Sequence, residues 1–440
     1  MSEQEEKQTV SDTSSNHQRE HVLENAGHVS ALPQFPSTDD RSAWRKFWQS
    51  QHQPWRTEPE IDQERQHYLA QHLSIKPDIE HGIYAFKDIP LSRADVEWLL
   101  INHENGRGPV NWGDESQRRR DGLDLRGTNL KQVDLSHLPL ARMLGGLTWD
   151  EWNEASEQQR SNAVVLMQEA NLRGAHLECA RFRGAHLEGA NLKYSYLEAA
   201  QFRYTHLERA NLGGAFMDRT DLYRATISDE KHIGPSLVDI HWGDANLSVM
   251  KWSQVAMLGD EYKARQEKLK DKSIRLGEYE VAVRVNHQLV VALQSQGLNE
   301  DASRFAYRAQ ALQRVVLRLQ AFQPQVSFWQ RVRKLSSYCF SLFLDVLAGY
   351  GYQPAKTALW YLFVIACFTS AYAFFGHLPL LPDALVFSFM SFHGRGFFPS
   401  LSNETNLHNP LVILAAAEAV IGLFIEISFI ATFTKRFFGD

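Results

Sequence analysis

Residues 170–227 read ANLRG AHLEC ARFRG AHLEG ANLKY SYLEA AQFRY THLER ANLGG AFMDR TDLYR ATI. A large apolar residue recurs at every fifth position, and a small residue stands two positions before it. The large residues are Leu172, Leu177, Phe182, Leu187, Leu192, Leu197, Phe202, Leu207, Leu212, Met217, Leu222 and Ile227. A period of five fits neither the 3.6-residue period of a helix nor the two-residue period of a strand. The pattern therefore predicts a repeat in which one large and one small residue per unit point inward and the other three point outward.

This unit resembles the A(N/D)LXX repeat of the pentapeptide-repeat family. The resemblance implies a right-handed four-sided β-helix, with one pentapeptide on each side and twenty residues in each coil. The sequence contains that spacing, because Asn171, Asn191 and Asn211 repeat at one position and His186 and His206 at another. Stacked strands lie about 4.8 Å apart. We therefore expect each of these side chains to lie against the one twenty residues later.

The charges of the repeat also follow a pattern. The positions directly after the large residues alternate in sign, from Arg173 and Glu178 to Arg203 and Glu208. On twenty-residue coils, like charges would lie along each side and opposite charges would face one another around the corners. Residues 168–227 hold seven acidic and eight basic side chains, which excludes the strongly acidic, DNA-like surface of some family members. We interpret the histidines as surface rings and predict no metal site, because ladder neighbours belong to separate coils without an acidic companion of fixed geometry.

The overall composition excludes several classes of protein. The 440 residues carry 46 basic and 52 acidic side chains, a net charge of −6, so we expect no general affinity for nucleic acid. The three cysteines, at 179, 339 and 367, are too widely spaced for a disulfide framework or a cysteine-rich zinc site. We find no nucleophile–base pair, phosphate-binding loop or metal-spaced cluster in the sequence, so we predict no enzyme activity and no cofactor.

Composition and periodicity predict a mixed fold class with several segments. In order, these are a disordered arm at 1–40, a mostly helical region at 41–121, the repeat β-helix at 122–255 with a helix inserted near 148–166, a helical hairpin at 260–322, an interfacial helix at 329–350, a transmembrane helix at 357–376, a short helix and loop at 382–399, and a second transmembrane helix at 410–434. The channel resemblance described below implies that 382–399 is a pore helix and filter loop. In the hairpin, Asn299 is expected to cap the second helix. The arm has no apolar core, so it is not predicted to be a signal peptide.

Two segments near the end of the chain are long and apolar enough to cross a bilayer. About 19 apolar residues lie in 357–376 and about 24 in 410–434, against the roughly 20 that a span needs. Residues 329–350 are shorter and charged, so we predict a helix in the interface. Between 377 and 409 the only basic residue is Arg395. The positive-inside rule therefore places both termini, and the repeats, in the cytoplasm of a multi-pass protein of the plasma membrane.

The segment between the spans carries the functional signal. Pro382 and Asp383 open an apolar helix too short to span, and a Gly-x-Gly sequence follows. This order resembles the two-transmembrane pore-loop channels related to potassium channels. The resemblance implies a selectivity filter, whose residues here are Ser391, Phe392, His393, Gly394, Arg395, Gly396 and Phe397. A potassium filter reads Thr-Val-Gly-Tyr-Gly-Asp. Here His393 stands at the position of the Val and Arg395 at the position of the Tyr, so potassium selectivity is not expected.

Two glutamates in the second span are costly in lipid and are therefore functional candidates. Glu418 is the natural partner of Arg395 if that side chain points away from the pore. If Arg395 faces the axis instead, a ring of guanidinium groups repels cations. Glu426 either forms an acidic ring that favours cations or makes a hydrogen bond between subunits. Gly422 is a candidate flexible point of a gating helix.

These features predict an oligomeric ion channel with a cytoplasmic pentapeptide-repeat domain for assembly or sensing. Its expected partners are further copies of itself, the lipid bilayer and the permeating ions, and the channel resemblance implies four subunits. The alternative is a non-conducting, membrane-anchored scaffold for protein–protein interaction.

Overall fold

The computed structural model describes residues 35–37, 40–103, 115, 120–266, 271–323, 327–377, 379–394 and 410–437. Most of the arm expected at 1–40 lies outside these residues. The chain divides into two compact units, residues 1–61 and 62–440.

The first unit contains the helix α2 (Arg41–Ser50). The side chain of Asp40 accepts a hydrogen bond from the Ser42 backbone and so caps its first turn. α2 buries Trp44 and Trp48, and the Arg56 guanidinium lies 3.6 Å from the centre of the Trp48 ring. These tryptophans therefore act as packing anchors of this unit.

The second unit opens with two helices that lead into the repeats. α3 (Gln63–Leu73) and α4 (Arg93–Asn102) are joined by Arg65, which donates to both carboxylate oxygens of Asp95 at 2.9 and 3.0 Å. Between the helices, Pro90 makes a parallel bridge to Asn129. This region therefore covers the edge of the first coil, which would otherwise be open to pairing with another chain.

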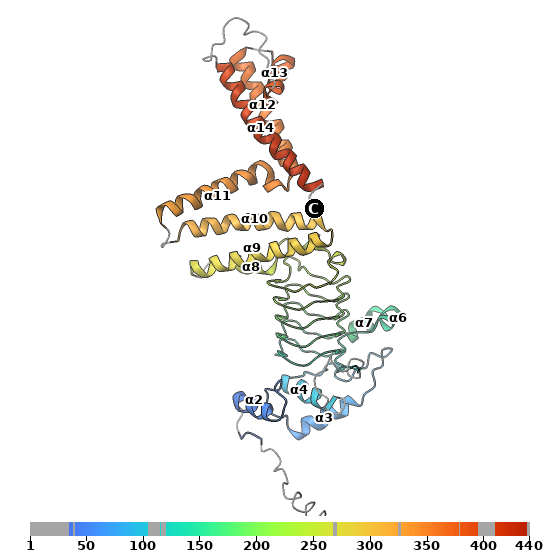
Figure 1. Cartoon of the computed structure of the whole chain (residues 1–440). Coiled ribbons are helices and arrows are strands. Elements are labelled where there is room, and N and C mark those ends of the chain that lie inside the picture. Colours follow the sequence, from blue (N-terminus) through green and yellow to red (C-terminus); the bar gives the residue numbers. More distant parts are fainter. Residues whose placement is uncertain are drawn as a thin grey trace, which may run out of the picture. The chain divides into compact units, whose positions relative to one another are not determined.

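The repeats form stacked coils of twenty residues (Figure 1). Parallel bridges join Asn171 to Asn191 and His186 to His206. The side-chain amide of Asn191 donates to the side-chain oxygen of Asn171 at 3.0 Å. The predicted register is thus confirmed. Within the described residues each side of a coil contributes an isolated bridge rather than an extended strand, because a turn every five residues leaves no longer straight stretch.

The large and small residues of the repeat fill the interior, as predicted. All twelve large residues of 172–227 are at most 4% exposed. The rings of Phe182 and Phe202 stack inside with centroids 5.1 Å apart. Where the small residue is polar its hydroxyl is bonded to the main chain, as from Ser195 to the Leu192 carbonyl at 2.7 Å. The interior therefore buries few polar groups, and these have partners.

Each five-residue repeat turns at a residue with positive φ. At Gly174 and Gly184 φ is 63° and 71°, but Tyr194 and Arg209 adopt the same conformation, with φ of 57° and 58°. A left-handed backbone costs a non-glycine residue about 1–2 kcal/mol. At Tyr194 the N–H donates to the Gly213 carbonyl of the next coil at 2.9 Å, which holds this conformation. The sequence pattern did not indicate it.

Two short helices, not the single helix expected at 148–166, interrupt the repeat. They are α6 (Trp149–Glu154) and α7 (Glu157–Ala163). Thr148 caps α6, but Ser156 forms a second capping box that starts α7. A strong cap inside a helical pattern therefore ended the first helix early.

The residues before this insert belong to the same solenoid. Asp124 bridges Leu144 twenty residues later, whereas Asp134 bridges Asn171 across 37 residues. The difference of 17 residues is the length that the insert adds to one coil. The insert therefore leaves the register of the stack unchanged.

Helices follow the last coil. They are α8 (Gly259–Gln266), α9 (Lys272–Ser295) and α10 (Asn299–Ala321). α9 and α10 pack along apolar stripes that include Leu289 and Phe305, each 1% exposed. The expectation that Asn299 caps α10 was wrong, because the cap position is Leu298, which makes no side-chain hydrogen bond.

The helical hairpin also covers the end of the solenoid. Trp252 fills the last coil at 1% exposure, and its ring meets the Phe305 ring edge-on at 6.0 Å. Arg304 donates to the carbonyl oxygens of Trp252 and Val255 at 3.3 and 3.1 Å. Both open edges of the stack are therefore capped within the chain.

The chain ends in a set of apolar helices. They are α11 (Phe328–Ala348), the turn η6 (Gly349–Gly351), α12 (Pro354–Gly376), the turn η7 (Leu380–Ala384), α13 (Leu385–Phe392) and α14 (Pro410–Phe437). Two stretches are long and apolar enough to cross a membrane: Ala355–Gly376, with a mean hydropathy of 1.8, and Leu411–Ala431, with 2.2. α13 is shorter and packs against both α12 and α14.

Candidate functional site

Glu418 lies at the centre of this helix set and is 0% exposed. Its Oε2 accepts a hydrogen bond from the Tyr372 hydroxyl of α12 at 2.7 Å, and its Oε1 accepts one from the Ser388 hydroxyl of α13 at 2.5 Å. One carboxyl group of α14 thus connects all three helices. The two hydroxyl donors offset part of the cost of burying it.

Glu418 was a candidate from the sequence, but its partners Tyr372 and Ser388 were not. Pairing of Glu418 with Arg395 was one of two alternatives, and it stays a prediction because Arg395 lies outside the described residues, as do Gly396 and Phe397. Tyr372 and Ser388 were read as parts of apolar helices, although a hydroxyl in such a helix is the available signal for a buried polar partner.

The first residues of the expected filter belong to α13. Ser391 and Phe392 form its last turn, and both are buried. The Ser391 hydroxyl donates to the Ala415 carbonyl at 3.3 Å. Gly394 follows with a φ of 66°, a conformation that ends the helix. The first two residues that the channel resemblance assigned to the filter are thus helical, and their side chains pack between α12 and α14.

Gly422 allows the end of α13 to approach α14. A side chain at this position would place its Cβ 2.2 Å from the Phe392 carbonyl oxygen. Such a contact leaves no room even for alanine. The structure thus supplies a packing reason for Gly422 that is separate from the expected flexibility.

His393 and Glu426 line a groove between α12 and α14. The Nδ1 of His393 is hydrogen-bonded to the Glu426 carboxylate, and its Nε2 lies 3.3 Å from the Tyr361 hydroxyl. The groove has a volume of about 530 Å³, and most of its other lining side chains are apolar, such as Ile425 and Phe429. The two side chains are 32% and 35% exposed. The groove therefore places the hydrogen-bonded pair of His393 and Glu426 beside apolar side chains.

Histidines, not basic residues around the corners, pair with the glutamates of the repeat. The imidazole Nδ1 lies 2.7 to 3.2 Å from a carboxylate oxygen two residues later in three pairs: His176–Glu178, His186–Glu188 and His206–Glu208. These hydrogen bonds raise the pKa of His176 and His206 above the usual value, against the opposing effect of burial. Each histidine reaches its glutamate because residues two apart on a strand share a face. The expectation that opposite charges face one another around the corners stays a prediction.

The comparisons with known proteins concern this repeat. Residues 167–203 and 200–229 match the family model of pentapeptide repeats, which has 8 copies. The centre of this chain is a pentapeptide-repeat solenoid. No curated protein matches the chain.

Solved structures that are similar to this chain include two pentapeptide-repeat proteins and one fluoroquinolone resistance protein. Rfr23 from the cyanobacterium Cyanothece 51142 is 26% identical, with a TM-score of 0.15, over 26% of this chain and 60% of its own. HetL, involved in heterocyst differentiation regulation in Nostoc sp. strain PCC 7120, is 24% identical, with a TM-score of 0.14, over 27% and 50%. QnrB1, a plasmid-mediated fluoroquinolone resistance protein, is 13% identical, with a TM-score of 0.12, over 35% and 92%. The chain thus spans about half to three fifths of the first two.

A half-buried ion pair joins the cap of the pentapeptide-repeat solenoid to the apolar helices. Asp345 of α11 accepts hydrogen bonds from Arg314 at 2.6 Å and from the Tyr307 hydroxyl at 3.0 Å, and Lys356 lies 3.5 Å away. Burial works to raise the pKa of Asp345, but Arg314 and Tyr307 together hold it below the usual value. Asp345, which in the sequence counted against a spanning helix, therefore anchors α11 to α10.

Proposed function

We propose that this chain is a membrane ion channel whose pore-loop domain carries the pentapeptide-repeat solenoid on the cytoplasmic side of the plasma membrane. One arrangement supports the proposal: α13 is held between two membrane-length helices by the buried carboxyl group of Glu418. α13 has eight residues, and a helix of that length rises only about 12 Å. A segment of this kind is stable at membrane depth where it is buried in protein or lines a water-filled path.

The groove supplies the residues for the conducting path. Phe424 and Ile430 on α14 are 58% and 63% exposed, which suits contacts with lipid or with neighbouring subunits. Several copies of the chain, packed around one axis, would enclose the groove lined by His393 and Glu426. A ring of Glu426 carboxylates there would favour cations over anions.

α11 is proposed to lie in the membrane interface beside this domain. Phe328 and Trp329 are 69% and 78% exposed, and Arg331, Arg333 and Lys334 follow directly in the sequence. Apolar rings beside basic residues are typical of helices that bind the cytoplasmic surface of a bilayer. A protease added outside intact cells should therefore leave the solenoid whole, and removal of the solenoid would contradict this orientation.

Electrical recording from the purified chain in planar bilayers tests the proposal. We expect single-channel currents that favour cations, and a reversal potential that moves toward zero in Glu426→Gln under a salt gradient. Glu426→Asp, which keeps the charge, is the matched control. An absence of current from chains that are shown to be inserted and oligomeric would overturn the channel.

The same recording distinguishes the two roles of Arg395. If Arg395 faces the axis, Arg395→Gln keeps assembly and increases cation preference. If it pairs with Glu418, Arg395→Gln impairs assembly, and Glu418→Gln in the same chain restores part of it. Intact assembly with unchanged selectivity would exclude both roles.

A membrane-anchored scaffold is the second candidate, and the solenoid surface favours it. Tyr194 is 49% and Tyr196 36% exposed, and the Arg173 guanidinium lies 5.2 Å from the Tyr194 ring centre. Exposed tyrosines beside arginine are enriched where proteins bind one another. Partner capture that depends on Tyr194, from a chain that carries no current, would support the scaffold in place of the channel.

A further inference from the structure

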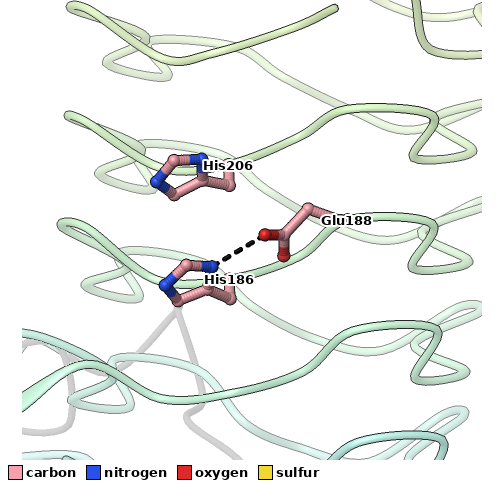
Figure 2. A group of neighbouring side chains, drawn as sticks. All are labelled: His186, Glu188 and His206. Atoms are coloured by element: carbon pink, nitrogen blue, oxygen red, sulfur yellow. Dashed lines mark hydrogen bonds and ion pairs between the residues drawn. The ribbon is translucent and has the colours of Figure 1, made fainter. Parts of the chain in front are cut away.

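Three side chains on one side of the solenoid bring metal-binding atoms together. His186 and Glu188 belong to one coil and His206 to the next (Figure 2). One donor atom from each of these residues lies within 4.8 Å of those from the other two. In a tetrahedral zinc site, with metal–ligand distances near 2.1 Å, neighbouring donor atoms are about 3.4 Å apart. Small side-chain rotations would therefore bring all three donors to one ion.

The backbone under this cluster is held by the solenoid ladder. The Leu187 N–H donates to the His206 carbonyl at 2.9 Å, and the His206 N–H donates to the Ala185 carbonyl at 2.9 Å. The two imidazole rings stack with centroids 4.6 Å apart and an angle of 2° between their planes. Because parallel rings do not direct their nitrogens at one point, binding requires the rings to tilt toward each other.

The carboxylates beside the rings have unused acceptors. One oxygen of Glu188 bonds the Nδ1 of His186 at 2.7 Å, and one of Glu208 lies 3.2 Å from the Nδ1 of His206. The second oxygen, Oε2, of each glutamate is buried and has no hydrogen-bond partner in the described part of the chain. A buried carboxylate oxygen without a donor is costly. The same holds for Glu178 and Glu198 of the repeat, but among the described residues only beside Glu188 do two imidazoles lie close enough for a shared cation, which would satisfy its free oxygen.

The side chains are open enough for an ion to enter. His186, Glu188 and His206 are 32%, 33% and 38% exposed. Imidazole nitrogen and carboxylate oxygen are the donors of zinc sites with three protein ligands, in which water occupies the fourth position. The closest alternative is that these groups are only hydrogen-bonded surface rings.

We propose that His186, Glu188 and His206 bind one divalent transition-metal ion, with Zn²⁺ the best match to the donor set. Glu208 accepts a hydrogen bond from the ring of His206 and orients it. Because two ligands come from one coil and the third from the next, the ion would link neighbouring coils of the solenoid. This site is independent of conduction through the membrane domain.

His176 provides a matched control within the same chain. It forms the same His-x-Glu pair, with its Nδ1 2.9 Å from Glu178. Its ring also stacks on the side chain twenty residues later, but that neighbour is Tyr196, with centroids 4.5 Å apart. The pair at 176 thus has the same local geometry but lacks the second imidazole.

Calorimetric titration of the full chain in detergent with Zn²⁺, without a histidine tag and with Mg²⁺ as the control ion, tests this inference. We expect saturable binding of one Zn²⁺, weakened at least about tenfold by His186→Gln or by His206→Gln, and unchanged by His176→Gln. Circular dichroism shows whether each variant remains folded, and Glu188→Gln serves if a histidine variant does not.

Three results would overturn the site. They are the absence of saturable Zn²⁺ binding, equal weakening by His176→Gln, and full binding by the double variant His186→Gln, His206→Gln. Because titration does not measure current, these results do not depend on whether the chain conducts.

Discussion

The solenoid and the membrane-length helices bury opposite kinds of side chain. In the solenoid the twelve large repeat residues of 172–227 are inside, each at most 4% exposed, and the charged residues largely face outward. In α12, Leu362 and Phe374 are 63% and 74% exposed, whereas Glu418 of α14 is 0% exposed. A chain buries what its surroundings solvate least well, so water drives apolar groups inward and lipid drives polar groups inward.

The two regions also differ in how many contacts their stability depends on. Each coil of the solenoid is joined to the next by main-chain hydrogen bonds on every side. The membrane-length helices are linked by a few side chains, with Glu418 bonded to both Tyr372 and Ser388. A surface change should therefore have little effect on the solenoid, whereas a single interior change in the helix set should alter the packing of three helices.

The largest expected effect is that of a charge inside the solenoid. Leu192 is 0% exposed, and Leu192→Asp places a carboxylate there without a partner, at a cost of several kcal/mol. We expect the repeats to unfold and become sensitive to trypsin. Tyr194→Asp, at a position that is 49% exposed, should stay within about 0.5 kcal/mol of the original stability. Equal protease resistance of the two variants would contradict the assignment of the interior.

A charge on the outside of α12 should have the next largest effect. Leu362 is exposed, and in lipid Leu362→Lys costs about 2.5–3.5 kcal/mol at the centre of a span. We expect less of the chain in carbonate-washed membranes, whereas a surface lysine in water would be neutral. Unchanged insertion would mean that this face of α12 does not contact lipid.

Removal of the acceptor at Glu418 should have a smaller effect on stability. Glu418→Leu leaves the hydroxyls of Tyr372 and Ser388 without their acceptor, at a cost of about 1–3 kcal/mol. Glu418→Gln retains a carbonyl acceptor and should cost less. Melting of both variants in detergent measures the difference, and equal melting temperatures would show that these hydrogen bonds contribute no stability.

The smallest effect is expected at Asp345. Its pKa is lowered in the folded chain, so its contribution is present above the ordinary value of about 3.9 and is lost as the pH falls through the lower folded value. Asp345→Asn should cost at most about 1 kcal/mol at neutral pH. The variant should also lose less of its free energy of unfolding than the original chain as the pH falls below about 4. Identical acid unfolding of Asp345→Asn and the original chain would rule out this contribution.

Several features of this protein followed from the sequence alone. The five-residue period assigned the interior of the solenoid, from Leu172 to Ile227, because it states which residues of each unit point inward. The twenty-residue spacing of Asn171 and Asn191 set the register for the same reason. The length and apolar composition of 357–376 and 410–434 were also sufficient to predict the long helices, since both properties are local.

Only the tertiary structure decided which polar groups meet. Tyr372 and Glu418 are 46 residues apart, and nothing periodic connects them. His186 and Glu188 both point outward because the single residue between them, Leu187, points inward. The next coil places the imidazole of His206 beside them. The twenty-residue spacing showed the ladder of histidines, but the expectation of no acidic companion of fixed geometry was wrong, because His186 is hydrogen-bonded to Glu188 and His206 to Glu208. Side-chain pairing depends on directions and on distances between segments, and a repeat pattern specifies only which side of the chain each residue occupies.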